Sequence, residues 1–170
     1  MESYDLQSVA ELLAGEYVVN SNRSVCVIVK SELYQRKKEN NIMFRTIRKK
    51  KNEISIDTAK ALLQSSRRGV LAVNGDDGYP YAIPINYVYD DDAQKIYFHG
   101  ARAGHKVDAL RACDKVCFTV YGNETIKEED WAPFVQSVVV FGRCHLVESS
   151  ARATTLLKRF AMKYLSLIHI

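Results

Sequence analysis

Five stretches of the chain are rich in β-branched and aromatic residues, a composition typical of β-strands. They cover residues 70–74, 81–89, 95–99, 115–121 and 137–147. Short connections, residues 75–78 and 90–94, separate the first three stretches, and such connections join antiparallel neighbours in hairpins. The first three strands are therefore expected to form an antiparallel meander. A longer loop is expected at residues 123–136, before the fifth strand.

Helical periodicity predicts three helices around this strand pattern. Ser55 or Asp57 can cap the first, which ends before Arg68, and a short second helix covers residues 106–113. The third helix carries its apolar residues on one stripe: Ala153, Leu156, Leu157, Phe160, Ala161 and Tyr164. Strands and helices do not alternate regularly, so a doubly wound fold is not expected. The pattern favours a mainly β fold, a small antiparallel barrel with peripheral helices.

The 170 residues have the length of one domain, and the two ends of the chain differ from its middle. Residues 1–42 combine a weak helical pattern, an apolar run at 25–29 and a polar stretch at 31–41. Because these pieces form no evident core, we expect an extension of doubtful structure that is either poorly ordered or non-native. Residues 43–165 are expected to form the barrel domain. The apolar ending, residues 166–170, resembles a translated cloning adaptor and predicts that the domain is truncated at its C-terminal end.

The net charge of +4 comes from one short run of the chain. A surface that binds nucleic acid spreads its phosphate contacts over a folded face. Here the excess is confined to Arg45, Arg48, Lys49, Lys50 and Lys51. A solvated linker is therefore preferred, and no nucleic-acid partner is expected. Neither a membrane-length apolar run nor a signal peptide is evident, so we expect a cytoplasmic protein with no membrane contact.

Cysteine spacing gives no sign of a metal site. Cys26, Cys113, Cys117 and Cys144 include no CxxC pair. Nothing else in the sequence indicates secretion, so reduced and buried thiols are expected rather than disulfides or a zinc site.

Two prolines, Pro80 and Pro84, interrupt the second predicted strand. Proline cannot donate a ladder hydrogen bond, so part of this strand should be an edge or a bulge with backbone groups free for a ligand. Period-two alternation divides its side chains between two faces. One face holds Tyr81, Ile83, Ile85, Tyr87 and Tyr89, and the other holds Pro80, Ala82, Pro84, Asn86 and Val88. Such faces could line a site for a flat ring, although they are more often plain barrel core.

A glycine-containing turn at residues 99–106 leads from a strand into a helix. The N-terminus of a helix offers free backbone N–H groups and a dipole that favours an anion. Lys106, and His105 when protonated, add donors there, so the turn is a candidate phosphate site. Most turns of this kind nevertheless bind nothing. His99 is either a barrel-edge histidine bonded to backbone, or a polar contact and proton donor beside a bound ring.

Six segments, taken in order, resemble the pyridoxamine 5'-phosphate oxidase-like FMN-binding split barrels and, more closely, the 5-nitroimidazole antibiotic resistance family. They cover about three quarters of the chain. The segments are Met43-Phe-Arg, Arg68-Gly-Val-Leu-Ala-Val73, Gly78-Tyr-Pro-Tyr-Ala-Ile-Pro-Ile-Asn-Tyr-Val-Tyr89, Ile96-Tyr-Phe-His-Gly100, Gly104-His-Lys106 and Ser137-Val-Val-Val-Phe-Gly142.

The resemblance implies an antiparallel split β-barrel of Greek-key type and a homodimer with two FMN sites at the subunit interface. It puts the flavin phosphate near His105 and Lys106 and matches His99 with the family's active-site histidine. The implied flavin-binding residues are Pro84, Ile85, Asn86, His99, Gly100, His105 and Lys106, and no metal is implied. Family domains continue past the helix of Phe160 into a further strand that is not found here. Barrel closure and the dimer surface are therefore open questions at this point.

The leading functional hypothesis is an FMN-dependent reductase of small aromatic or nitroaromatic compounds. Hydride would pass from the flavin N5 to the substrate, and His99 would contact the substrate or supply a proton. No dinucleotide fingerprint is present, so NAD(P)H would bind only transiently. One alternative is a haem-binding split barrel with His99, His105 or His145 as axial ligand. Another is a non-catalytic module that binds flavin or pyridoxal phosphate.

Overall fold

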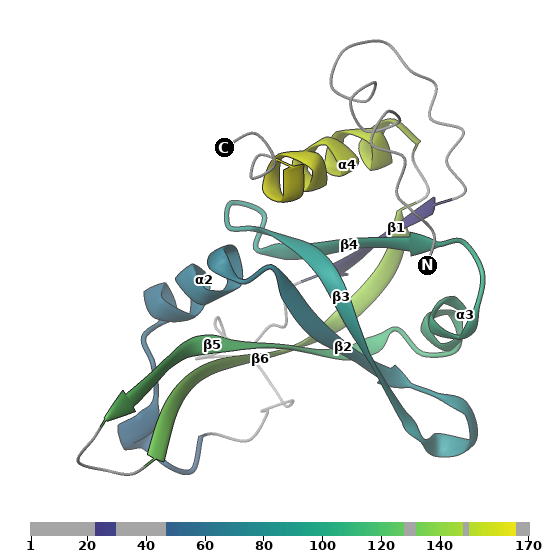
Figure 1. Ribbon diagram of the computed structural model, residues 1–170. Coiled ribbons are helices and arrows are strands. Elements are labelled where there is room, and N and C mark those ends of the chain that lie inside the picture. Colours follow the sequence, from purple (N-terminus) through teal and green to yellow (C-terminus); the bar gives the residue numbers. More distant parts are fainter. Residues whose placement is uncertain (1–22, 30–46, 128–131, 148–149, 166–170) are drawn as a thin grey trace, which may run out of the picture.

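The structure, a computed structural model, describes residues 23–29, 47–127, 132–147 and 150–165 (Figure 1). Its strands are β1 (Arg23–Val29), β2 (Arg68–Asn74), β3 (Pro80–Asp90), β4 (Lys95–Ala101), β5 (Lys115–Lys127) and β6 (Ala132–Val147). The α-helices are α2 (Ile56–Ser65), α3 (His105–Ala112) and α4 (Ser150–Leu165), and short 3₁₀ turns cover Lys50–Asn52 and Asp76–Gly78. None of the described helices is long and apolar enough to cross a membrane.

The six strands form a closed antiparallel barrel in the order β1-β4-β3-β2-β5-β6. Strands β2, β3 and β4 are the predicted meander. The chain then returns through α3, so that β5 lies beside β2, and this arrangement is a Greek key. The mainly β split-barrel fold predicted from the sequence is therefore confirmed.

Strands β5 and β6 are longer than the sequence predicts, and the loop expected at residues 123–136 is wrong. Paired residues reach Lys127 on β5 and begin at Ala132 on β6, with a shift of register between Gly122 and Thr125. The outer part of this hairpin is exposed on both faces, so its residues show no alternation of apolar and polar side chains. Trp131, which the sequence put in the loop, lies outside the described residues.

A strand that the sequence did not predict comes from the N-terminal extension. The apolar run at residues 25–29 belongs to β1, which pairs with β4 on one side and with β6 on the other. The barrel thus closes through a segment that precedes the predicted domain. The domain boundary at residue 43 stays a prediction, and residues 166–170 lie outside the described residues.

Strand β3 changes partner near its middle. Residues 80–86 pair with β2, whereas Tyr87 begins the ladder with β4. The segment that contains Pro80 and Pro84 therefore has a paired neighbour on one side only among the described strands. This confirms the edge that the two prolines predict, because neither can donate to a second ladder.

The barrel core is built around three aromatic side chains with no exposed surface, Tyr87, Phe98 and Phe118. Tyr87 and Phe118 meet edge to face, with ring centroids 4.8 Å apart. Phe118 lies against the backbone of Gly69, where an added Cβ would come within 2.2 Å of the ring. Only glycine permits this approach, so Gly69 is part of the core packing.

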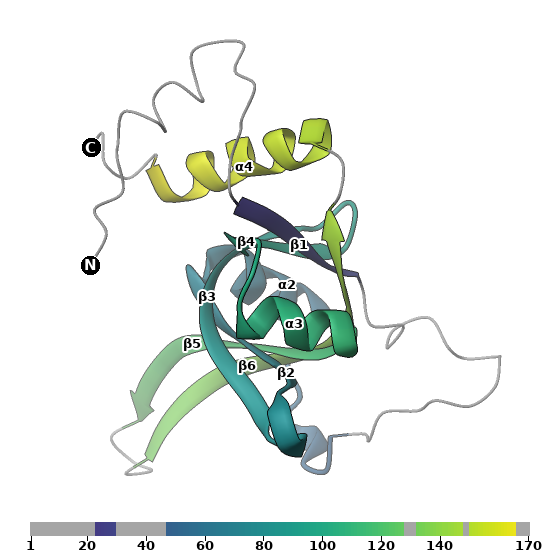
Figure 2. The same cartoon turned by 90° about the vertical axis from the view of Figure 1, so that its right-hand side faces the viewer.

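Helix α2 begins where the sequence predicts, because the Ser55 hydroxyl accepts a hydrogen bond from the Thr58 backbone N–H. It buries Leu62 and Leu63 against the barrel. Figure 1 shows α2 and α3 on opposite sides of the barrel, and both views place α4 beside β1 and β4 (Figures 1 and 2). The three helices are peripheral, in agreement with the sequence.

Polar contacts hold helix α4 against the barrel near Asp90 and near Tyr87. Arg159 forms an ion pair with Asp90 at the end of β3. In the last turn of α4, the Tyr164 hydroxyl accepts a hydrogen bond of 2.9 Å from the Tyr87 N–H. It also lies within donating distance of the carbonyl oxygens of Tyr87 and Arg67. The phenol therefore supplies polar contacts at the point where the β2–β3 ladder ends and the β3–β4 ladder begins.

Replacing Tyr164 with Phe should lower the free energy of unfolding by about 1–3 kcal/mol, because the backbone groups of Tyr87 and Arg67 lose a partner. Tyr79→Phe is the matched control, since the Tyr79 side chain is 76% exposed. Urea denaturation of both variants checks this, and equal stability of the two variants would contradict it.

Candidate functional site

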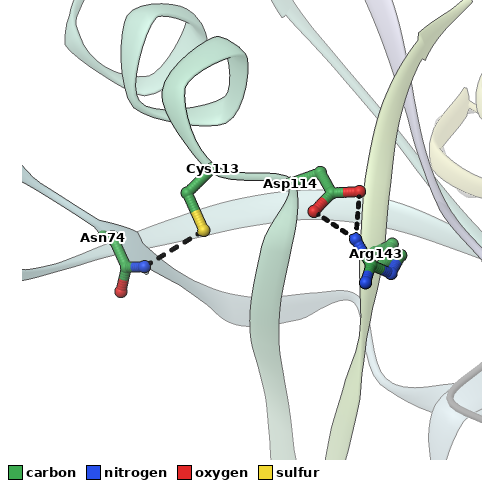
Figure 3. A network of polar contacts seen from close by, with 4 residues as sticks. All are labelled: Asn74, Cys113, Asp114 and Arg143. Atoms are coloured by element: carbon green, nitrogen blue, oxygen red, sulfur yellow. Dashed lines mark hydrogen bonds and ion pairs between the residues drawn. The ribbon is translucent and has the colours of Figure 1, made fainter.

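The C-terminal end of α3 is tied to the sheet by side chains from two strands (Figure 3). Asn74, at the end of β2, donates to the Cys113 sulfur at 3.2 Å. Asp114 accepts hydrogen bonds of 2.7 and 2.8 Å from the Arg143 guanidinium on β6. Arg143 also holds the pKa of Asp114 below its ordinary value. These contacts fix the position of α3 after β4, and so the position of the turn in front of it.

At its N-terminal end, α3 brings Lys106 onto the last residues of β4. A Cβ added to Gly100 would lie 2.6 Å from the Lys106 Nζ, so the ammonium group occupies the space that a side chain would fill. The same Nζ lies 5.5 Å from the centre of the Phe98 ring. Gly104 precedes the helix with a φ of 113°, a conformation that favours glycine. The structure thus brings together two of the predicted site residues, Gly100 and Lys106.

His105 points to a different neighbour. Its ring stacks on Tyr81, with centroids 4.1 Å apart and an angle of 12° between the planes. Its Nε2 lies 3.5 Å from a carboxylate oxygen of Asp76, in the turn between β2 and β3. His105 therefore joins α3 to the hairpin in front of it. Lys106, the next residue, is the one directed to the end of β4.

His99 lies on β4 next to Gly100, and its ring meets helix α4. The ring centroids of His99 and Phe160 are 4.8 Å apart, at an angle of 84°. The imidazole is partly exposed. An edge-to-face contact of this kind holds the orientation of the ring.

The predicted residues on β3 divide between the two faces of the strand. Pro84 and Asn86 are exposed, whereas Ile85 is 8% exposed and belongs to the core. The β3–β4 ladder ends with the pair Tyr87 and Phe98, so Asn86 and His99 each lie directly next to the last residue of their strand in this ladder. Ile85 lies beside Asn86 on the face of β3 that points into the core.

Ring contacts between distant parts of the chain are absent from the sequence prediction. The stripe in the last predicted helix identifies Phe160 as apolar, but no local signal pairs it with His99. The alternation of β3 gives the face of Tyr81 without indicating a stack on His105.

In the described part of the chain, no group of three or more His, Cys, Asp or Glu side chains is arranged to hold a metal ion. Cys113 and Cys117 are free thiols at partly buried positions.

A family model described as pyridoxamine 5'-phosphate oxidase matches residues 55–166, about two thirds of the chain. The chain belongs to this family. The matched residues run from the cap of α2 to the end of α4, so they include β3, β4 and α3, whereas β1, which pairs with β4 at His99 and Gly100, precedes them. No curated protein sequence matches the chain.

Solved structures share the fold of this pyridoxamine 5'-phosphate oxidase family member. A candidate 5-nitroimidazole antibiotic resistance protein from Bacteroides thetaiotaomicron is 18% identical, with a TM-score of 0.59 over 65% of this chain and 66% of that one. A conserved hypothetical protein from Mycobacterium tuberculosis is 22% identical, with a TM-score of 0.57 over 66% and 65%. The flavocytochrome Anf3 of Azotobacter vinelandii is 23% identical, with a TM-score of 0.54 over 64% and 51%.

These likenesses establish the fold of the family member and nothing finer. The chain spans slightly less than two thirds of the first two proteins and about half of the flavocytochrome. Activity, ligand and assembly must therefore be argued from the residues of this chain.

Proposed function

We propose that this chain binds FMN, with the flavin phosphate at the N-terminus of α3 beside Lys106, and that it acts as a reductase of small aromatic or nitroaromatic compounds. One observation carries the proposal, the close approach of the Lys106 ammonium group to Gly100. The family supports it, as does the fold shared with a protein described as a flavocytochrome.

The residues at this turn suit a phosphate. The Gly104 carbonyl oxygen accepts from the N–H groups of Val107 and Asp108, which begin the helical hydrogen bonds. The N–H groups of His105 and Lys106 come before this first turn and are available to an anion. The lysine ammonium adds a charge-assisted donor, and the helix dipole favours negative charge at the same end. These donors and the positive charge support the proposal that a phosphate binds at this turn.

The flavin ring system would lie along the exposed face that contains Pro84 and Asn86, toward His99. A bound flavin supplies the hydride chemistry, and the protein orients the ring and the substrate. His99, held against Phe160, is the residue we assign to contact the substrate or to provide a proton. NAD(P)H is the proposed electron donor and would bind transiently.

A homodimer is part of this proposal, and an exposed apolar face supports it. Alternate residues of β6 and one residue of β5 form this face, with exposed fractions of 68% for Tyr121, 48% for Val135, 47% for Val139 and 37% for Phe141. Tyr121 pairs with Ser137, which lies between Val135 and Val139 on the same side of the strand. A contiguous apolar face on a soluble protein marks an interaction site, and a second copy of the chain is the occupant we propose.

Lys106→Ala should weaken FMN binding by roughly 10- to 100-fold, because the phosphate loses a charge-assisted hydrogen bond. Flavin fluorescence titration gives the affinity, and visible absorption after desalting shows whether flavin is retained. Lys158→Ala, at an exposed position of α4, is the control and should bind FMN as the unaltered chain does. Unchanged affinity in Lys106→Ala would refute the phosphate site.

His99→Ala should retain FMN and lose turnover of a nitroaromatic electron acceptor by about 10²-fold or more, the usual loss when a general acid is removed. Steady-state reduction of the acceptor by NAD(P)H measures this. A variant that keeps both flavin and full turnover would remove His99 from the reaction. Flavin binding without turnover in the unaltered chain would instead favour a non-catalytic module.

Val139→Lys should convert the dimer to monomers, because a charge at the centre of the apolar face cannot be buried without a partner. Met162→Lys is the control, since Met162 is 63% exposed on α4 and lies outside this face. Sedimentation velocity distinguishes the two states. A monomeric unaltered chain at micromolar concentration would rule out the assembly.

A further inference from the structure

Helix α3 has little support of its own at its first turn. It has eight residues, and a helix of this length is not stable alone in water. Gly104 occupies the N-cap position and has no side chain that could accept a hydrogen bond from the first N–H groups. The place of this turn, and of Lys106 on it, therefore depends on contacts with other elements.

His105, the first residue of α3, makes two of these contacts. Its ring stacks on Tyr81 with centroids 4.1 Å apart, and its Nε2 lies 3.5 Å from a carboxylate oxygen of Asp76. Both partners belong to the β2–β3 hairpin. The same hairpin reaches the other end of the helix, where Asn74 donates a hydrogen bond to the Cys113 sulfur (Figure 3). One hairpin thus contacts α3 at both of its ends.

The turn that carries Asp76 has a fixed backbone. The Gly75 N–H donates to the Tyr79 carbonyl oxygen at 2.8 Å, and the Tyr79 N–H donates to the Asp76 carbonyl oxygen at 3.0 Å. A Cβ added to Gly75 would lie 2.8 Å from that Tyr79 oxygen and 3.5 Å from the Nε2 of His105. The backbone of the turn therefore lies directly beside the imidazole, and the carboxylate of Asp76 is held within its reach.

The strength of the contact with Asp76 depends on protonation. An imidazole changes charge between about pH 5 and 8, and only the protonated ring forms an ion pair with a carboxylate. The titratable and charged groups around His105 are Asp76 in the turn, Tyr81 on β3, and Lys106, Asp108 and Arg111 on α3. Asp108 lies 3.6 Å from Arg111, and Lys106 is directed to Gly100. Asp76 is thus the carboxylate that pairs with the protonated ring.

We propose that His105 is a positioning residue for the phosphate site, and that its protonated ring, paired with Asp76, holds the first turn of α3 where Lys106 meets the phosphate. This inference rests on the proposed binding of FMN at the turn. A site that is formed in only part of the molecules binds its ligand more weakly in proportion. Losing the pair should therefore weaken FMN binding, although removing a carboxylate near an anion would by charge alone strengthen it. The sign of the effect distinguishes position from charge.

Fluorescence titration of FMN into the full chain, at about pH 6 and about pH 8.5, tests this inference. At the lower pH, Asp76→Asn should bind FMN about three- to fivefold more weakly than the unaltered chain, the range expected for an exposed ion pair. At the higher pH, where a histidine is neutral, the two affinities should agree within about twofold. The ratio of the two affinities at each pH cancels the titration of the FMN phosphate itself.

Asp77→Asn is the matched control. Asp77 is the next exposed carboxylate of the same turn, and its left-handed φ of 52° suits asparagine. This variant loses the same charge without losing the partner of His105, so it should not weaken FMN binding at either pH.

A second background shows whether the effect runs through His105. His105→Phe keeps an aromatic ring against Tyr81 but carries no charge, so adding Asp76→Asn to it should cause no further loss at the lower pH. Circular dichroism confirms that each variant is folded. Equal or tighter binding by Asp76→Asn at the lower pH, the same loss at both pH values, or a further loss in the His105→Phe chain would overturn the inference and leave the proposed flavin site standing. An unaltered chain that binds no FMN would overturn the proposed function and this inference with it.

Discussion

The site depends on the inability of β3 to pair on both sides along its whole length. Pro80 and Pro84 have no backbone N–H, and residues 80–86 pair with β2 alone. From Tyr87 onward the same strand pairs with β4. The change of partner falls between Asn86 and Tyr87, and it leaves residues 80–86 as an edge among the described strands. Pro84 and Asn86 are exposed on this edge, and Tyr164 provides polar contacts to the β3 backbone at Tyr87.

The topology also determines where the positive charge of Lys106 lies. The Greek-key return from β4 to β5 has to cross the barrel, and α3 forms part of this crossing. Contacts of Cys113 and Asp114 hold the far end of the helix, so its N-terminus and Lys106 are fixed against Gly100. A fixed helix N-terminus with a lysine needs little rearrangement when it binds an anion, which favours affinity. The proposed phosphate site is in this sense a product of the fold.

Much of this could be predicted from the sequence, because the signals were local. Alternation along residues 81–89 gave both faces of β3, and the two prolines gave its unpaired edge. The glycine turn before Lys106 indicated the start of α3. Contacts between distant segments had no such signal. The stack of His105 on Tyr81 and the contact of His99 with Phe160 depend on how the barrel closes. The pairing of β1 could not be predicted from the sequence either, because an apolar run does not specify which strand it joins.

The central claim is that Lys106 and the N-terminus of α3 bind the phosphate of a flavin. Comparing the affinities of the unaltered chain for FMN and for riboflavin tests it most directly, because the two ligands share the ring system and differ in the phosphate. FMN should bind at least about tenfold more tightly than riboflavin, and this difference should shrink at high salt. Equal affinities, or binding of neither flavin, would contradict it.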